Sequence, residues 1–304
     1  MLNKKILNTL KNKINNKKFK IETNLGQFTI NHTKNHQLKK FLKDFPLYDR
    51  FIPHLAEQNK KKIIDIGANI GDTLSLIKSK SNIDIVCVEP DEKFYKILEK
   101  NVSENNFSGV KLYPYAISSS KKKIEITNID NDSSGFITES KTGKITKSFE
   151  ELIIELNIKF QDFGIIKIDT DGFDWDCLNS IHSYFVKNNE SVDFIFYEHQ
   201  TATNNQLDNI EERRIGEKKY FDALNDFKEL GYNKFFVFDN YGTFLIETSE
   251  IDLIHSLVLY LRKSFSINKI KTIYFFDILI TKDKNVKQVY SAIDSYKNSQ
   301  IKIL

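Results

Sequence analysis

A glycine turn between an apolar run and an amphipathic segment is the stretch best suited to bind a ligand. Residues 63–66 are mostly isoleucine, and the turn is Gly67-Ala-Asn-Ile-Gly71. Residues 72–80 have apolar residues on one side of a helix, as expected of an amphipathic segment. Strand, glycine turn and helix form the first unit of a nucleotide-binding α/β sheet. Gly67, Asn69 and Gly71 are therefore candidate ligand contacts, although such a turn also serves as a plain connection.

Two carboxylates at predicted strand ends favour a ligand over a plain turn. Asp65 ends the first strand, and Glu89 follows the second apolar run, residues 83–88, 24 positions after Asp65. At the tip of the second strand, a carboxylate can accept hydrogen bonds from both hydroxyls of a ribose. We therefore expect the ligand to contain adenosine.

The composition of the turn decides between two adenosine ligands. A dinucleotide fold requires Gly-x-Gly-x-x-Gly, so that a pyrophosphate can bind at the helix N-terminus. Here Asn69 replaces the middle glycine, and Asp65 would repel a pyrophosphate. S-adenosylmethionine has no phosphate and has a cationic end, which suits an acid. The pattern thus predicts S-adenosylmethionine rather than NAD.

Further acids follow two later predicted strands. Asp169 comes directly after residues 163–168, and Glu198 and His199 come after residues 192–197. Ligands of open α/β sheets bind at the carboxyl ends of the strands. Asp169 could hold the methionyl amine or act as a general base toward a hydroxyl. Glu198 and His199 could act together, one as a general base and the other as the group that orients it, since histidine titrates near neutrality. The alternative is that His199 is a partly buried histidine whose hydrogen bonds are satisfied within the protein.

The same acids allow two other interpretations. Asp169, Glu198 and Asp239 could form an oxygen-rich Mg²⁺ site, with ligands at three strand ends. Mg²⁺ is the less favoured alternative here, and no metal ligand is assigned. Asp171 and Asp174 could cap the helix expected to begin near residue 173.

Four sequence blocks together resemble the FkbM-type family of S-adenosylmethionine-dependent methyltransferases. They are Asp65-Ile-Gly-Ala-Asn-Ile-Gly-Asp72, Val88-Glu-Pro90, Ala116-Ile-Ser118 and Ile166-Lys-Ile-Asp-Thr-Asp-Gly172. The resemblance covers residues 48–282, approximately. Members usually have Val-Glu-Gly at positions 170–172 and a glutamate at position 174, where this chain has Thr-Asp-Gly and an aspartate.

The resemblance implies a fold, a reaction and further contacts. The fold would be the α/β, Rossmann-like class I methyltransferase sheet, with six parallel strands, one antiparallel strand and helices on both faces. The reaction would be O-methylation of a sugar, surface glycan or secondary metabolite. Pro90, in the Val88-Glu-Pro90 block, would contact the cofactor. Tyr115 and Ala116 follow the third predicted strand and lie where the adenine would stack, although Tyr115 could equally be a buried strand end. Tyr48 and Asp49 would approach the cofactor.

The remaining elements predict one large domain between two smaller segments. Residues 1–58 are expected to form a helical and hairpin cap, 59–285 the methyltransferase domain, and 286–304 a peripheral, helical tail. Residues 1–18 have the pattern of a helix with one apolar face. The loop at 128–147 could be a lid in which Asp132, Ser133 and Ser134 touch a ligand, or a solvated turn.

Composition narrows the functional class. The formal net charge is only +4 over 304 residues, which gives no sign of a nucleic-acid partner. Cys87 and Cys177 lie in apolar patterns, as expected of free thiols in a reducing cytoplasm. No apolar run approaches the length of a membrane span. The rival functions are a nucleic-acid methyltransferase, which would need Asn-Pro-Pro-Tyr after the fourth strand, an NAD-dependent oxidoreductase, and a non-catalytic binding module.

Overall fold

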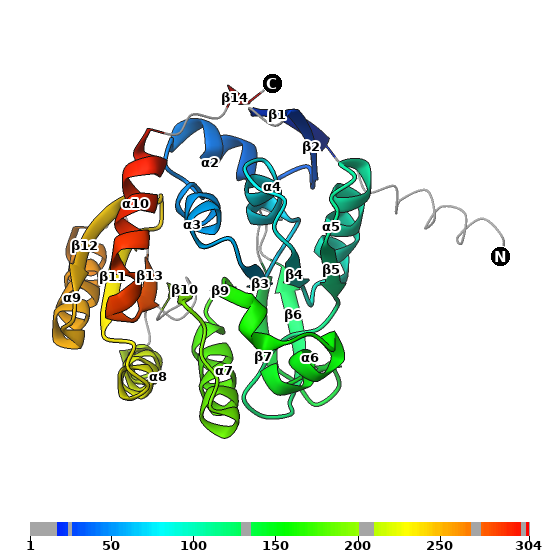
Figure 1. The fold of residues 1–304 in the computed structure, drawn as a ribbon. Coiled ribbons are helices and arrows are strands. Elements are labelled where there is room, and N and C mark those ends of the chain that lie inside the picture. Colours follow the sequence, from blue (N-terminus) through cyan, green and yellow to red (C-terminus); the bar gives the residue numbers. More distant parts are fainter. Residues whose placement is uncertain are drawn as a thin grey trace.

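The chain folds as an α/β protein around one large sheet with helices on both faces (Figure 1). The computed structural model describes residues 17–23, 26–128, 135–200, 210–268, 275–298 and 302–303. Most of the helix expected over residues 1–18, together with Asp132, Ser133 and Ser134 of the expected lid, lies outside these ranges.

The central sheet has eight strands in the order β12-β11-β13-β10-β9-β3-β4-β5. In chain order the strands are β3 (Lys62–Ile66), β4 (Ile85–Val88), β5 (Val110–Tyr113), β9 (Phe163–Ile168), β10 (Phe194–His199), β11 (Lys234–Asp239), β12 (Phe244–Thr248) and β13 (Phe276–Thr281). Among the described strands of this sheet, β12 and β13 run in the direction opposite to the other six. The predicted class of sheet is confirmed, with one correction to the strand count. The additional strand, β12, forms a hairpin with β11 at the edge.

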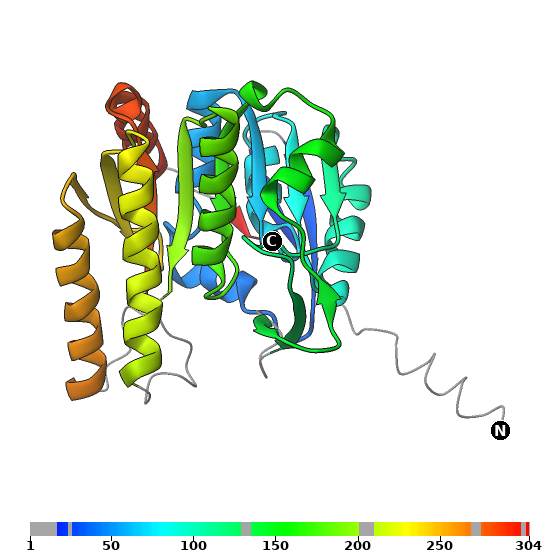
Figure 2. The same cartoon turned by 90° about the horizontal axis from the view of Figure 1, so that it is seen from below.

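Helices cover the two faces of this sheet separately (Figure 2). The helices are α2 (Leu38–Asp44), α3 (Phe51–Asn59), α4 (Asp72–Lys78), α5 (Glu92–Glu104), α6 (Phe149–Leu156), α7 (Asp174–Asn188), α8 (Ile210–Glu229), α9 (Ile251–Asn268) and α10 (Val286–Lys297). The core on one face takes its helical residues from α6 to α9. The core on the other face takes them from α3, α4, α5 and α10.

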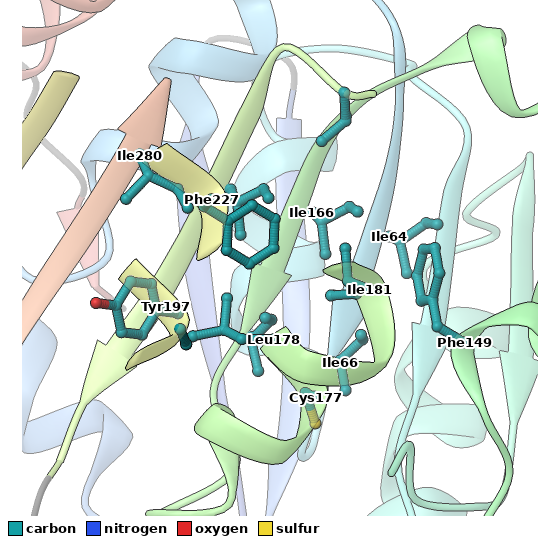
Figure 3. Close-up of a cluster of buried hydrophobic side chains, with 14 of the residues drawn as sticks. Ile64, Ile66, Phe149, Ile166, Cys177, Leu178, Ile181, Tyr197, Phe227 and Ile280 are labelled. Atoms are coloured by element: carbon teal, nitrogen blue, oxygen red, sulfur yellow. The ribbon is translucent and has the colours of Figure 1, made fainter. Parts of the chain in front are cut away.

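Strand periodicity divides the buried residues between these two cores. Successive side chains of a strand point to opposite faces. Ile64 and Ile66 of β3 accordingly pack with Ile166 of β9 and Ile181 of α7 (Figure 3). Ile63, in contrast, belongs to the core beneath α3 and α10. The same alternation decides which polar side chains meet at the carboxyl edge of the sheet.

The terminal segments pack on the helices next to the glycine turn. The strands β1 (Lys17–Thr23) and β2 (Gly26–His32) form the expected hairpin, and β14 (Lys302–Ile303) pairs with β1. The hairpin and α2 share a small core with α4 and α5. The helix expected in the C-terminal segment is present as α10, and its inner face is buried against the sheet.

Two local features concern a loop and a proline. Residues 128–147, expected to be a loop, contain two short strands in their described part: β6 (Lys123–Asn128) pairs with β7 (Gly135–Glu139) and β8 (Lys144–Ile145). Pro53 lies in the first turn of α3. Proline is tolerated there because the N–H groups of the first turn have no intrahelical partner.

Candidate cofactor and acceptor site

The glycine turn brings the ends of β3 and β9 into close backbone contact. Gly67 has a φ of +85°, and a Cβ atom at this position would lie 1.8 Å from the carbonyl oxygen of Asp169. Only glycine adopts this conformation readily and leaves room for the neighbouring chain. The backbone N–H of Asp169 donates to the carbonyl of Ile66 at 2.9 Å. The turn is therefore seated directly against the strand end that carries Asp169.

Glu89 ties the second strand to the same turn. Its Oε2 accepts the backbone N–H of Asn69 at 2.8 Å, and its Oε1 accepts that of Asp91 at 2.8 Å. Asn69 has a φ of +48°, and its side chain lies 3.4 Å from Nε2 of His36 in the segment before α2. Burial raises the pKa of the Glu89 carboxyl to about 8, although the two amide donors oppose this shift. Glu89 thus holds the shape of the turn, and each of its oxygens keeps a second lone pair for a ligand.

A buried lysine, Lys167, joins the first strand end to the fourth. Its Nζ lies 3.4 Å from Oδ1 of Asp65 and 3.0 Å from Oδ2 of Asp169. Burial alone would lower the pKa of Lys167, but nearby carboxylates, Asp169 and Asp65 first, keep it well above its ordinary value. Asp65 is fully buried, and its Oδ2 has no hydrogen-bond partner among the described residues. Sequence reasoning missed Lys167, although a lysine inside an otherwise apolar strand was the available signal.

Glu198 lies on the same face of the sheet as Lys167. Lys167 and Phe196 are partners in the pairing of β9 with β10, and Glu198 follows Phe196 by two residues. On its other side, Glu198 is the Cα partner of Asp277 in β13. Asp277 was also missed, and its signal was similar: one acid within the last apolar strand. Burial, followed by Asp169 and other acids, raises the pKa of Glu198 well above its ordinary value.

Two more acids face this edge from the helical layer. Asp49 lies between α2 and α3 with a φ of +55°, and Asp72 is the first residue of α4. Burial raises the pKa of Asp49 to about 8 and that of Asp72 to about 6. We refer to six side chains as the acidic cluster: Asp49, Asp65, Asp72, Asp169, Glu198 and Asp277. Tyr48 lies beside it, and burial and these acids raise the pKa of its hydroxyl.

His199 points away from the acidic cluster, which corrects the expected pairing with Glu198. It shares a face with Tyr197, whose hydroxyl lies 3.0 Å from Nδ1 of His199. The imidazole packs against Tyr220 of α8, with ring centroids 4.5 Å apart. Burial lowers the pKa of His199 to about 3. This environment is that of a buried, neutral histidine.

The remaining expected cofactor contacts lie on or near the edge beyond Glu89. The hydroxyl of Tyr115 donates to Glu155 of α6 at 3.0 Å, and the Nζ of Lys147 lies 4.1 Å from the centre of its ring. This geometry favours a buried strand end for Tyr115. Ala116 is buried, and its carbonyl accepts the N–H of Lys147. The carbonyl of Pro90 accepts the ammonium of Lys144 at 2.7 Å.

The acids after β9 connect loops instead of capping α7. The side chain of Asp174 accepts hydrogen bonds from the N–H and hydroxyl of Thr170 and from the N–H of Glu198. The N-cap residue of α7 is Phe173, and it makes no side-chain cap. The expected cap is therefore wrong for Asp174, because its carboxylate turns back toward the strand ends. Burial raises the pKa of Asp174 to about 7.

The suggested magnesium ligands are not brought together. Oδ1 of Asp239 accepts the backbone N–H groups of Tyr241 and Thr243 in its own turn. Its neighbour Phe238 belongs to the core under α3 and α10, so Asp239 points to the opposite face from Glu198. Within the described ranges, the His, Cys, Asp and Glu side chains include no group of three or more arranged to hold a metal ion.

Comparison with known proteins identifies a family profile and several structures. The profile of the Methyltransferase FkbM domain matches residues 65–234, more than half of the chain. No curated protein sequence matches. None of the helices in the described part of the chain combines the length and apolar composition needed to span a membrane.

Three solved methyltransferase structures are partly similar to this chain. An O-methyltransferase from Bacillus cereus, in complex with S-adenosylhomocysteine (SAH), is 14% identical, with a TM-score of 0.41, over 81% of this chain and 90% of that chain. A candidate caffeoyl-CoA O-methyltransferase from Staphylococcus aureus is 16% identical, with a TM-score of 0.42, over 92% and 100%. The plantazolicin methyltransferase BpumL, also with SAH, is 13% identical, with a TM-score of 0.36, over 82% and 88%.

Proposed function

The chain belongs to the FkbM methyltransferase family, and we propose that it transfers a methyl group from S-adenosylmethionine to a hydroxyl oxygen of a sugar, surface glycan or secondary metabolite. The single observation that carries this proposal is the glycine turn, held between Glu89 on one side and the Asp169 strand end on the other. The division into cap, methyltransferase domain and tail, and a cytoplasmic location, remain predictions.

The residues present fit S-adenosylmethionine on two counts. Glu89 lies at the tip of β4 with lone pairs left for ribose hydroxyls. The buried Oδ2 of Asp65 has no hydrogen-bond donor in the described part of the chain, as expected of an acceptor beside a ligand ammonium. Gly67, Asn69 and Gly71 would let the ligand approach the backbone, with Pro90 and Ala116 toward the adenine. When bound, the cofactor supplies a methyl group on a positively charged sulfur.

Asp169 is the proposed catalytic base. Its side chain is 47% exposed at the strand end, and the ammonium of Lys167 holds one of its oxygens. A carboxylate in this place can take the proton that an acceptor hydroxyl loses as its oxygen gains the methyl group. Glu198 would bind and orient the acceptor on the same face. His199 is left out of the proposed machinery because it faces α8.

Calorimetric titration of the purified chain with SAH and, separately, with NADH tests the proposal. We expect SAH to bind and NADH not to bind. Each ribose hydroxyl that donates to Glu89 contributes about 0.5–1.5 kcal/mol, so the loss of two such bonds in Glu89→Ala should weaken SAH binding roughly fivefold to a hundredfold. Glu99→Ala, on the exposed side of α5, is the matched control and should change nothing.

The outcomes separate the proposal from its rivals. Absence of SAH binding, or an unchanged affinity in Glu89→Ala, would leave the glycine turn as a structural connection. Binding without methyl transfer to any hydroxyl acceptor in a radiolabelled donor assay would favour a non-catalytic binding module. Binding of NADH in place of SAH would favour an oxidoreductase.

A further inference from the structure

The acidic cluster gathers six carboxyl groups around one lysine, Lys167. The ion pairs that its members form within the described chain are those of Lys167 with Asp65 and Asp169. Asp49, Asp72, Glu198 and Asp277 form no ion pair in these ranges. Burial and the neighbouring acids raise the pKa of Glu198 and Asp277 well above their ordinary values, which favours the neutral form of both groups while no cation is bound. A cation bound beside them would compensate their charge and let them ionise.

Glu198 shows where the compensating cation would bind. Its side chain is 6% exposed, and its Oε2 has no hydrogen-bond partner among the described residues. The face it shares with Asp277 and Asp169 directs it toward the cluster and away from the core on the other side. Directly opposite residues of antiparallel strands have Cβ atoms about 4.5–5.5 Å apart, so one donor group can reach both Glu198 and Asp277.

We infer that the acceptor carries a cationic ammonium group, which binds between Glu198 and Asp277 while its hydroxyl faces Asp169. An amino sugar, or another alcohol with a free amine, fits this description, whereas a uronic acid or a phosphorylated sugar would be repelled. The inference rests on the proposed function and specifies its acceptor. An ammonium offers three donors, enough for the unpaired oxygen of Glu198 and for Asp277 together.

The location of the pair separates this cation from the cofactor. The unpaired oxygen of Asp65 lies at the end of β3, next to the glycine turn. Glu198 and Asp277 lie beyond β9, on β10 and β13. Two separate buried acceptors thus mark two positions along the edge, one for the methionyl end of the cofactor and one for the acceptor. Asp169 lies between them, where the methylated hydroxyl would be.

Binding of matched sugars tests the inference. The full chain, with and without saturating SAH, is titrated with glucosamine, N-acetylglucosamine, glucose and glucuronate at near-neutral pH, where glucosamine is still largely protonated. These probes share a ring and differ mainly in one charged or neutral group. We expect glucosamine to bind at least tenfold more tightly than the two neutral sugars, and glucuronate not to bind.

Three variants locate the effect. Glu198→Gln and Asp277→Asn keep the side-chain size and should each remove the preference for glucosamine while SAH affinity stays within about twofold of the wild type. Asp239→Asn, at the same edge of the sheet but on the other face, is the matched control and should keep the preference. SAH affinity also reports that each variant is folded.

The outcomes of these titrations decide whether Glu198 and Asp277 bind an ammonium group. Equal binding of charged and neutral sugars, a preference for glucuronate, no sugar binding at all, or a preference that survives both variants would overturn the inference. Titration with MgCl₂ alone is a further arm, and tight Mg²⁺ binding that Glu198→Gln abolishes would assign the pair to a metal instead. Failure of SAH binding would refute the proposed function separately, because the sugar titrations are also made without SAH.

Discussion

Glu198 and His199 are adjacent in the chain, yet their side chains lie on opposite faces of the central sheet. Glu198 faces the acidic cluster, where Asp277 lies directly opposite it on the neighbouring strand β13. His199 faces α8 and packs on Tyr220. One residue can therefore act on a ligand at this edge, and the other holds a helix in place.

This separation predicts different consequences for the two residues. His199→Phe should keep the packing on Tyr220 and lose the contact with the hydroxyl of Tyr197, at a cost of about 1 kcal/mol of unfolding free energy. SAH affinity, glucosamine affinity and methyl-transfer rate should stay within about threefold of the wild type. Because burial lowers the pKa of His199 to about 3, the pH–rate profile should show no step belonging to this residue. A loss of turnover with binding intact would instead identify His199 as the base.

Gly67 and Gly231 form a natural pair for testing the glycine turn. Their φ angles are +85° and +86°, but a Cβ atom meets the Asp169 carbonyl at Gly67 and nothing within 4 Å at Gly231. Gly231→Ala should cost about 1 kcal/mol of unfolding free energy, from backbone strain alone. Gly67→Ala should cost about 3 kcal/mol or more and abolish SAH binding, because the backbone of β9 must also move. Denaturant titrations of both variants measure the difference, and equal costs would show that the close contact is unimportant.

Buried acids predict that the ligand-free protein loses stability as the pH rises. Folding raises the pKa of Asp49 and Glu89 to about 8, of Asp174 to about 7 and of Asp72 to about 6. Between the unfolded values near 4 and these folded values, the native state binds more protons than the unfolded state. The unfolding free energy should therefore fall from about pH 5 to pH 8.

Conservative variants measure the contribution of individual acids to this slope. Asp49→Asn and Glu89→Gln should each flatten the curve of unfolding free energy against pH, by up to about 1.4 kcal/mol per pH unit. Glu99→Gln, on the exposed side of α5, should leave the slope unchanged. Denaturant titrations at pH 5, 6, 7 and 8 supply the data. A stability that rises over this range would contradict the assignment of buried, protonated acids.

Local patterns predicted the parts of the site that lie within one strand-turn-helix unit. Gly67 and Asn69 could be placed from the sequence because an apolar run followed by glycines constrains its own geometry. Asp169 and Glu198 could be placed at an edge because parallel strands end on the same side. The sequence even contained the information that separates Glu198 from His199, since consecutive strand residues face opposite ways.

Contacts between distant strands were beyond local patterns. Lys167 joins Asp65 only because β9 lies beside β3, about a hundred positions away in the chain, in a register that aligns the two residues. Asp277 meets Glu198 through the antiparallel register of β13 with β10. The edge strand β12 was not among the seven strands expected, for a different reason: a strand of five residues at a sheet edge has only a weak apolar pattern.

Lys167 should be the most important single charge for the stability of the site. Lys167→Met removes the cation between Asp65 and Asp169, which leaves a fully buried carboxyl group without an opposite charge. Breaking a buried ion pair from one side typically costs about 3–5 kcal/mol. Asp65→Asn, added to Lys167→Met, should recover a large part of that loss, because it removes the uncompensated charge. Lys62→Met breaks a more exposed pair with Asp162 and should cost less than about 1 kcal/mol. Thermal and denaturant unfolding of the single and double variants give the interaction energy, and additive effects of Lys167→Met and Asp65→Asn would show that the two groups do not interact in the native state.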